Sequence, residues 1–270
     1  MKPVRPEFAP DPALSRSEME ALQREIAATA VFDDDLDFDP ATVRHDDAGQ
    51  QTLDTGSDDG RPDPPLVAGI DQAFVDDVAV SAVVVSRGDE IVERVHAAVE
   101  TEIPYIPGLL SFREGGAILA ALSELDCDPD LLVVDGSGRI HFREAGLATH
   151  VGVMFDVPAV GVAKNLLCGT PRESLDRKLS TGTRVGIEAD DSVETATPGT
   201  LIGYALQTRQ YDSPKRHVNP LYVSPGHRVS ADTTADLVAA TTDGYKLPEP
   251  TRLADSDADE AKAQVRSELS

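Results

Sequence analysis

The sequence contains no Trp, and aromatic residues make up only 4% of its 270 residues. A core must therefore be built mostly from Val, Leu, Ala and Ile, and the hydrophobic content of 40% is enough for one. No apolar run approaches the length of a membrane span, and the first residues contain no apolar signal core. We therefore expect a soluble, cytoplasmic protein with no membrane partner.

Cysteine is also scarce. Cys127 and Cys168 are far apart in the sequence, and neither belongs to a Cys-x-x-Cys motif or to a His cluster. This pattern is typical of buried free thiols in a reducing compartment.

Basic residues are few, because 24 Lys and Arg stand against 48 Asp and Glu, which gives a net charge of −24. Such a balance usually argues against nucleic acid as a partner, since phosphate binding favours a cationic surface. An Asp-rich, Lys-poor surface is also what a high-salt cytoplasm selects, because solvated carboxylates keep a protein hydrated there. We favour this halophilic interpretation, under which the overall charge says little about the ligand.

The chain divides into five segments. The Pro-rich residues 1–13 are predicted to be flexible, and residues 14–32 to form a packing helix with a capping box from Ser15 to Glu18. The acidic connector 33–63 is predicted to be flexible; its first Asp run lacks the Gly and closing Glu of a calcium loop. Residues 64–245 form the folded domain, and residues 246–270 an acidic tail, frayed if helical.

The pattern within residues 64–245 predicts the fold class. Three β-rich runs, 66–74, 78–87 and 90–98, are separated by short turns and form an antiparallel meander. A helix (112–125), a strand (131–135), a helix (143–155) and a strand (159–162) follow, and then a hairpin (184–188 with 199–207) and a helix capped by Ser230 or Asp232. This order predicts an α/β, ribonuclease-H-like fold, in which helices flank three antiparallel and then parallel strands.

Acidic residues end two of the buried strands. Asp71 ends the apolar stretch Leu66–Ile70 of the first run, and Asp135 ends the fourth strand. This topology places the two strands side by side. Glu114 lies on the helix between them. Three carboxylates without a Cys or His cluster suit a hard cation, Mg²⁺ or Mn²⁺. The alternative is that each acid simply faces solvent at the end of its element.

Other candidates are single residues whose ordinary alternatives are favoured. His227 and His141 fit surface positions better than catalytic ones. Lys164 follows a buried run at a sheet edge, where it could contact a phosphate, although a solvated lysine is the simpler interpretation. The loop from Pro104 to Gly108 is more unusual, because two prolines stiffen a tip that carries Tyr105. A rigid aromatic tip can separate stacked bases, although it can also fold back on the core.

Several motifs, in order, are similar to those of endonuclease V, the deoxyinosine-directed nuclease family. They are Pro104–Glu114, Val133–Gly136, His141, Gly146–His150, Gly161–Lys164 and Gly226–Ser230. The similarity covers about residues 15–245, and the proline-bounded motif is the most specific. Ser137, where the family often has His or Asn, and Phe142, where Pro is usual, depart from the pattern.

The resemblance implies a metal site and a phosphate site. Asp71 and Asp135 would bind Mg²⁺, which Mn²⁺ can replace, and Glu114 would complete the acidic site. His227 would assist at the metal-bound water or the scissile phosphate. Lys164 would contact the phosphate backbone near the cleavage site.

The resemblance also implies a recognition site for a flipped base. Tyr105, braced by Pro104 and Ile106, would be the wedge that fills the gap in the duplex. Gly108, Leu110 and Gly136 would wall the pocket for hypoxanthine, and His141 would lie near the cleaved strand.

The implied activity is a nick in the strand that carries the base, on the 3′ side of the lesion, leaving a 3′-hydroxyl and a 5′-phosphate. The implied substrate is deoxyinosine-containing DNA, with inosine-containing RNA as a further candidate, and we expect a monomer. The alternatives are a module that binds deaminated bases without cutting, and another nuclease of the same fold, such as a resolvase. Eight basic residues are expected to gather on the DNA face: Lys164, Arg172, Arg177, Lys178, Arg209, Lys215, Arg216 and Arg228.

Overall fold

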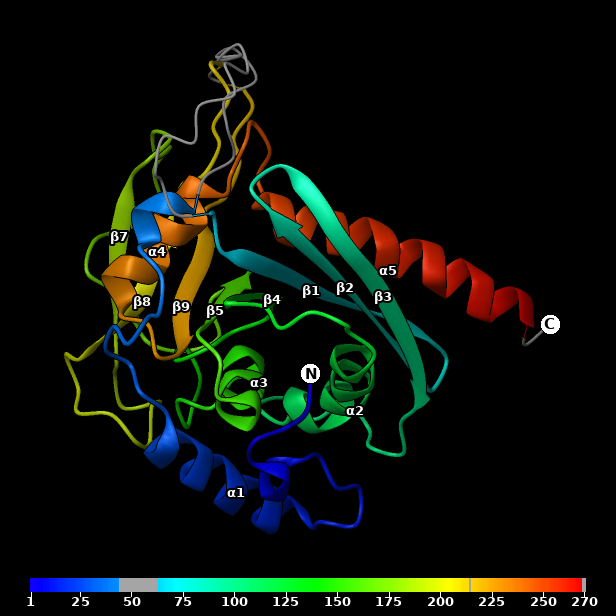
Figure 1. Ribbon diagram of the computed structural model, residues 1–270. Coiled ribbons are helices and arrows are strands. Elements are labelled where there is room, and N and C mark those ends of the chain that lie inside the picture. Colours follow the sequence, from blue (N-terminus) through cyan, green and yellow to red (C-terminus); the bar gives the residue numbers. More distant parts are fainter. Residues whose placement is uncertain (44–62, 214, 269–270) are drawn as a thin grey trace.

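The computed structural model describes residues 1–43, 63–213 and 215–268. Its centre is a sheet with the strand order β3-β2-β1-β4-β5-β9-β8-β7-β6 (Figure 1). The strands are β1 (Leu66–Val75), β2 (Val78–Arg87), β3 (Glu90–Glu100), β4 (Leu131–Asp135), β5 (Ala159–Ala163), β6 (Thr170–Pro171), β7 (Arg184–Glu188), β8 (Leu201–Leu206) and β9 (Leu221–His227). The helices are α1 (Arg16–Thr29), α2 (Leu110–Ser123), α3 (Leu147–Phe155), α4 (Ala231–Ala240) and α5 (Glu249–Glu268), with 3-10 turns η1 (Pro6–Phe8) and η2 (Pro40–Thr42).

The strand pairing is that of a ribonuclease-H-like sheet, so the predicted fold class is confirmed. Strands β1, β2 and β3 form an antiparallel meander, β4 lies parallel to β1, and β5 lies parallel to β4. The predicted hairpin is β7 with β8, and β9 runs antiparallel between β8 and β5. In the described part of the chain, no helix is both long and apolar enough to cross a membrane.

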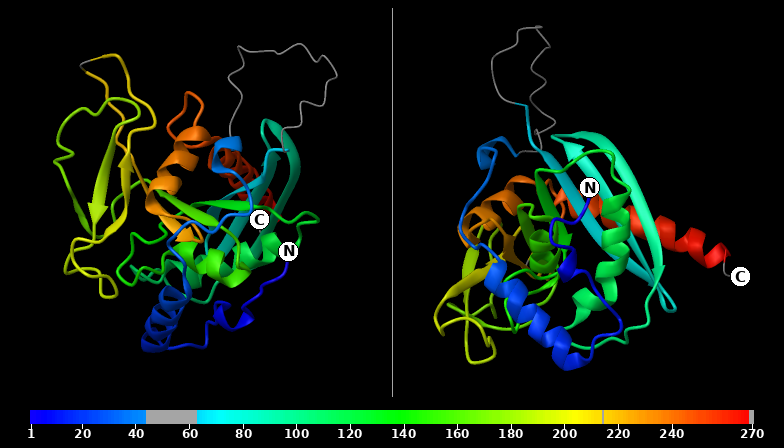
Figure 2. Two further views of the ribbon diagram at one scale, coloured as in Figure 1. Left: turned by 60° about the vertical axis from the view of Figure 1, so that its left-hand side comes forward. Right: turned by 60° about the horizontal axis from the view of Figure 1, so that its bottom comes forward.

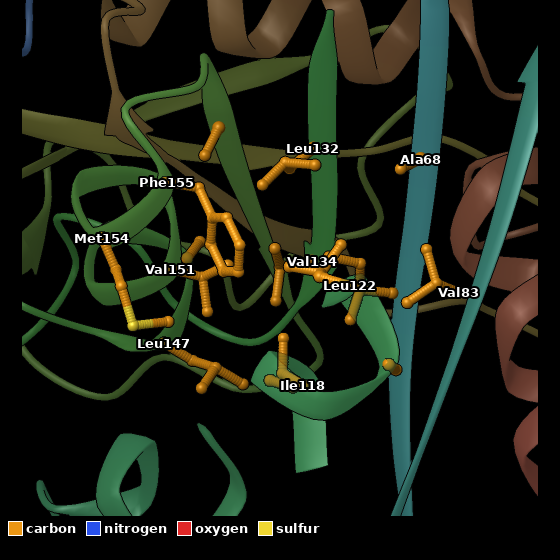
Figure 3. Close-up of a cluster of buried hydrophobic side chains, with 14 of the residues drawn as sticks. Ala68, Val83, Ile118, Leu122, Leu132, Val134, Leu147, Val151, Met154 and Phe155 are labelled. Carbon is orange, nitrogen blue, oxygen red and sulfur yellow. The ribbon is translucent and has the colours of Figure 1, made fainter. Parts of the chain in front are cut away.

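Helices cover both faces of the sheet, α2 and α3 on one and α4 and α5 on the other (Figures 1 and 2). Alternate residues of each strand face opposite sides. Val134 therefore packs with Ile118 of α2 and Phe155 of α3 (Figure 3), whereas Val133 joins the cluster beneath α4. Asp135 continues the alternation of Val133, so its side chain leaves the sheet on the side of α4 and α5.

The N-terminal residues 1–13, which their prolines predict to be loose, are instead packed against α2 and α3. The ammonium group of Met1 donates to the carbonyls of Leu122 and Leu125, both at 3.1 Å. The backbone N–H of Val4 donates to Met154 O at 3.0 Å, and Phe8 is buried. Backbone hydrogen bonds and one buried aromatic ring fix a segment whose composition alone indicates flexibility.

Helix α1 begins after Ser15, whose hydroxyl accepts a hydrogen bond from the N–H of Glu18. The first part of the acidic segment that follows is also packed. The carboxylate of Asp34 accepts hydrogen bonds from Ser230 N at 2.7 Å and from the Thr233 hydroxyl at 2.7 Å, at the start of α4. The rest of the predicted connector, residues 44–62, lies outside the described residues.

Residues 246–270, predicted to be an acidic tail, contain the long helix α5, which lies across β1 and β2 (Figure 1). Ala254, Ala258 and Ala261 are buried in a stripe with helical spacing, and such small side chains allow a close approach. The helix begins directly over Gly69, where an added Cβ would lie 1.9 Å from Pro250 O. This close approach sets the position of the next turn of α5 over the sheet edge.

Candidate active site

The centre of the candidate site is a pair of neighbouring aspartates. Ile70 of β1 lies opposite Val134 of β4 in the parallel register, and the next residue on each strand is an aspartate. Adjacent strands are about 4.8 Å apart, so Asp71 and Asp135 project side by side from the same edge. The structure thus brings together the two acids that the sequence singles out, although Asp71 lies within β1, which continues to Val75, and only Asp135 ends its strand.

A third aspartate, Asp255, reaches the pair from α5. Single carboxylate oxygens of Asp71, Asp135 and Asp255 all lie within 4.8 Å of one another. The sequence interpretation missed Asp255 because it assigned α5 to the tail. A signal was present: Asp255 directly follows Ala254, the first member of the small-residue stripe that holds the helix against the sheet.

The cluster carries an excess of negative charge in a buried setting. Burial, then the hydrogen bond and charge of Asp135, raise the pKa of Asp71 well above its usual range. Glu114 of α2 is also buried, and burial followed by the charge of Asp135 raises its pKa to about 8. Glu114 therefore lies near the cluster, although its oxygens are not among the three that converge. A bound cation would favour the charged form of both acids.

Lys164 provides the positive charge closest to these acids. It follows β5, whose end lies beside the end of β4, and its Nζ donates to Asp135 Oδ2 at 2.8 Å and lies 3.8 Å from Asp255 Oδ1. Partial burial acts to lower the pKa of Lys164, but the charge and hydrogen bond of Asp135, together with the charges of Asp71 and Asp255, outweigh it and raise that pKa. The lysine predicted to contact phosphate is therefore next to the acidic cluster.

A pocket of about 90 Å³ opens beside the cluster. Its lining residues are Tyr105, Pro107, Gly108, Leu110, Ser111, Gly136, Ser137, His141, Gly146, Leu147 and Leu167. Every residue predicted to wall the base pocket is in this set. Tyr105 is 68% exposed, as a wedge requires. Pro104 and Ile106, the sequence neighbours of Tyr105, are not among the lining residues, and Ile106 packs with Leu109 and Phe112, which fixes the base of the loop.

Hydrogen bonds to one carbonyl hold the pocket loop in place. Gly108 O accepts from Gln23 Nε2 at 2.9 Å and from His141 Nε2 at 3.1 Å. The other ring nitrogen of His141 accepts the N–H of Arg143, so the ring is neutral with its proton on Nε2. Burial and the charge of Arg143 agree with this, because they lower the pKa of His141 to about 4.

Gln23 and Arg143 are site residues that sequence reasoning missed. Arg143 Nε donates to Gln23 Oε1 at 2.7 Å, so α1 is tied to the pocket and does more than cover the domain. Gln23 is fully buried on the same face of α1 as Met19 and Ile26. A polar residue within an apolar helical stripe is the signal that could have identified it.

His227, predicted to assist at the reacting phosphate, lies at the opposite end of the sheet. It pairs with Ala159 at the start of β5, whereas Asp135 pairs with Val162 near its end. Three residues of strand separate the two positions by about 10 Å. The ring is buried, Nδ1 accepts from Val31 N at 3.2 Å, and Nε2 donates to Asp156 Oδ1 at 3.0 Å. Both nitrogens are thus committed to hydrogen bonds within the fold, which corrects the expected placement.

Carboxylates that converge at the edge of a ribonuclease-H-like sheet, with a small pocket beside them, define a nuclease of that fold class. The comparisons identify which one. The endonuclease V family model matches residues 50–256. The chain belongs to the endonuclease V family.

Similar proteins support this assignment at several distances. An endonuclease V from the halophilic archaeon Haloarcula marismortui is 69% identical over 97% of this chain and 98% of its own length. The structure of endonuclease V from Streptomyces avermitilis has 32% identity and a TM-score of 0.70, covering 93% of this chain and 95% of its own. Endonuclease V from Ciona intestinalis, solved with a 24mer DNA containing an inosine followed by a ribo-adenosine, shares the fold at 23% identity, with a TM-score of 0.67 over 92% of this chain and 98% of its own.

Proposed function

We propose that the protein is a Mg²⁺-dependent endonuclease that flips deoxyinosine out of DNA and nicks the same strand on the 3′ side of the lesion. The nick leaves a 3′-hydroxyl and a 5′-phosphate. One observation carries this proposal: Asp135 belongs to the carboxylate cluster, and the next residue, Gly136, lines the pocket. A base held in the pocket therefore places the adjoining phosphodiester backbone against the carboxylates.

The donor set fits Mg²⁺ or Mn²⁺. Asp71, Asp135 and Asp255 offer three hard oxygen ligands within reach of one ion. Burial and the neighbouring Asp135 raise the pKa of Asp71, and a cation would favour its charged form. When bound, the ion supplies Lewis-acid stabilisation of charge on the phosphate. Glu114 adds a fourth carboxylate nearby, where it can orient a water by accepting its hydrogen bond.

The remaining residues bind and orient the strand. Lys164 exchanges its contact with Asp135 for a phosphate oxygen. Tyr105 stands at the exposed tip of its loop and fills the gap that the flipped base leaves in the stack. The neutral His141 holds Gly108 O, so the pocket wall is rigid before the base arrives. The bound base replaces water in a pocket lined largely by backbone and apolar groups.

The decisive experiment compares five substrates in high KCl: an inosine duplex, a plain duplex, an RNA–DNA hybrid, a four-way junction and an inosine-containing RNA. We expect Mg²⁺-dependent nicking of the inosine duplex, at least 100-fold slower in Asp135→Asn, because a ligand to the ion is lost. Asp77→Asn, in the exposed β1–β2 turn, is the matched control and should retain full activity.

Other outcomes identify the alternatives. Preferential cutting of the hybrid or the junction would point to another nuclease of this fold. Tight binding of inosine duplex without nicking in either Mg²⁺ or Mn²⁺ would point to a non-cutting recognition module. Faster cutting of the inosine RNA than of the inosine duplex would make RNA the substrate.

A further inference from the structure

Of the eight basic residues expected on one DNA face, six fall into two groups; the other two are Lys164, at the acidic cluster, and Lys215. Three of them are neutralised at the surface by carboxylates. Arg172 Nε lies 2.7 Å from Glu188, Arg177 Nη2 lies 2.7 Å from Glu173, and Arg228 pairs with both Asp35 and Asp37. Arg228 also follows His227 and is thus at the wrong end of the sheet. These three give a polyanion little net attraction.

The second group gathers around the segment between β8 and β9. The guanidinium groups of Arg209 and Arg216 lie 5.1 and 4.0 Å from the ring centroid of Tyr211. Lys178 Nζ donates to the carbonyls of Tyr211 and Ser213, which ties this segment to the loop before β7. Within the described residues, none of these three cations forms an ion pair with a carboxylate. On a chain of net charge −24, such a cluster is exceptional.

The register places this cluster at the edge that carries the active site. Asp135 lies opposite Val162 of β5, Val162 lies opposite Val223 of β9, and Val223 lies opposite Tyr204 of β8. The chain leaves β8 two residues after Tyr204 and enters β9 two residues before Val223. The segment therefore extends beyond the carboxyl ends of β4 and β5.

Lys246 connects the cluster to the acidic site. Its backbone carbonyl accepts a hydrogen bond from the Thr208 hydroxyl at 2.6 Å, which places it beside the β8–β9 segment. Nine residues further along the chain, Asp255 on α5 belongs to the acidic cluster. In the part of the chain that the structure describes, Lys246 has no carboxylate partner either.

We propose that Lys164, Lys246, Arg209, Arg216 and Lys178 form a basic track that binds the phosphate backbone of the duplex arm on the 3′ side of the flipped base. This inference rests on the proposed function. The base pocket lies on the side of α2 and α3, whereas the track leads from the cluster along the side of α4. A strand that runs from the pocket across the carboxylates, and is cut 3′ of the base, reaches the track with its 3′ portion.

High salt makes such a track necessary. At about 1 M ionic strength the Debye length is about 3 Å, so distant charges of either sign are screened and only direct contacts with phosphate count. The surface carboxylates then repel DNA weakly, while unpaired cations at contact distance still bind it. Arg172, Arg177 and Arg228 are in contact with surface carboxylates and have no such capacity to spare. Lys164 has it because its partners Asp135 and Asp255 are the carboxylates proposed to bind the metal ion instead.

The first test measures the affinity for a lesion-free duplex across a KCl series by fluorescence anisotropy. The Arg209→Gln/Arg216→Gln variant should bind about tenfold more weakly at the lowest salt that maintains folding, and the slope of log K against log[KCl] should fall by about 2, because two phosphate contacts are lost. The matched control, Arg172→Gln/Arg177→Gln, removes the same charge and should change the slope by less than half as much. Arg209→Lys/Arg216→Lys should restore the slope.

The second test assigns the polarity by using inosine duplexes shortened on one side of the lesion. Shortening the 3′ arm should weaken binding by the wild-type protein but not by the double Gln variant, whereas shortening the 5′ arm should weaken both equally. The proposal would be overturned if shortening the 3′ arm weakened binding by the variant as much as binding by the wild type. It would also be overturned if the salt slope of the variant were unchanged. If the wild type did not nick inosine duplex at all, the proposed function would fail, while the lesion-free slopes would still test the track.

Discussion

The two ends of the central strands both contain buried ionisable groups, but in opposite electrostatic states. At the carboxyl end of β4, Asp71, Asp135 and Asp255 converge, and the pKa of Asp71 is raised. At the other end, His227 and Asp156 are paired at 3.0 Å, and the hydrogen bond from His227 lowers the pKa of Asp156. One end gathers more carboxylates than its contact with Lys164 balances, whereas at the other end His227 and Asp156 are paired with each other.

This contrast shows that unbalanced charge, more than residue type, marks the reactive end. A buried group that lacks compensation destabilises the fold unless a ligand supplies the compensation. His227 has the chemistry of a catalyst, yet both of its nitrogens are occupied by Val31 and Asp156. Asp255 has an ordinary side chain on an acidic helix, yet it completes the cluster.

The largest expected effect tests this contrast at Asp255. We expect Asp255→Asn to slow nicking of an inosine duplex by at least 100-fold, equivalent to about 3 kcal/mol, because an anionic ligand to the ion is lost. Single-turnover kinetics across a Mg²⁺ series would measure it. Asp257→Asn is the matched control on the same helix: it loses only a pair with Arg94 and should nick at the wild-type rate. Equal rates for the two variants would remove Asp255 from the site.

The sequence could predict the pair Asp71 and Asp135 because local patterns determine it. Each acid directly follows a buried apolar run, and the order of elements makes the two strands parallel neighbours. The pocket loop is predictable for the same reason, since two prolines and Gly108 define its shape within five residues. Gly108 has φ +80°, and an added Cβ would meet the Phe142 ring at 3.0 Å.

The rest of the site depends on packing between distant segments. Asp255 reaches the cluster only because α5 lies on Gly69, 186 positions earlier in the chain. Gln23 reaches Gly108 only because α1 folds back on the pocket. The composition of both segments indicates a solvated surface, so their roles follow from tertiary contacts that no local pattern encodes. His227 was misplaced because its loop motif does not show to which end of the sheet β9 delivers it.

The next effect concerns the pH dependence of stability. In EDTA, the folded protein holds a proton on Glu114 up to a pKa of about 8, whereas the unfolded chain releases it near 4.5. The unfolded state therefore binds fewer protons between these values, and stability falls as pH rises from about 4.5 to 8, by on the order of 3 kcal/mol for this group. Urea midpoints would measure it. Glu114→Gln should flatten the slope, and so should saturating Mg²⁺; an identical slope in the variant would contradict the assignment.

At the other end, His227→Gln should affect stability rather than chemistry. The substitution can keep a donor for Asp156 but removes the buried ring and the nitrogen that accepts from Val31 N, so we expect a loss of about 2 kcal/mol in the free energy of unfolding. Nicking at a temperature well below the transition should stay within threefold of wild type. A loss of 100-fold or more in a folded variant would return His227 to the reaction and erase the contrast between the two ends.

The smallest effect distinguishes acids that make specific hydrogen bonds from acids that only add charge to the surface of this very acidic chain. Asp34 supports the start of α4, whose N-cap is Ser230, by accepting hydrogen bonds from Ser230 N and the Thr233 hydroxyl, far from the cluster. Asp34→Ala should cost about 1 kcal/mol, because these hydrogen bonds are lost, and leave nicking unchanged. Asp33→Ala, which lies beside it, is the matched control and should change stability by less than half of that. Because Asp34 acts through short hydrogen bonds, its contribution to stability should persist in molar KCl. If high salt abolished this contribution to stability, Asp34 would act only as one of many surface charges. The end of the sheet that contains His227 would then depend on general electrostatics rather than on specific contacts.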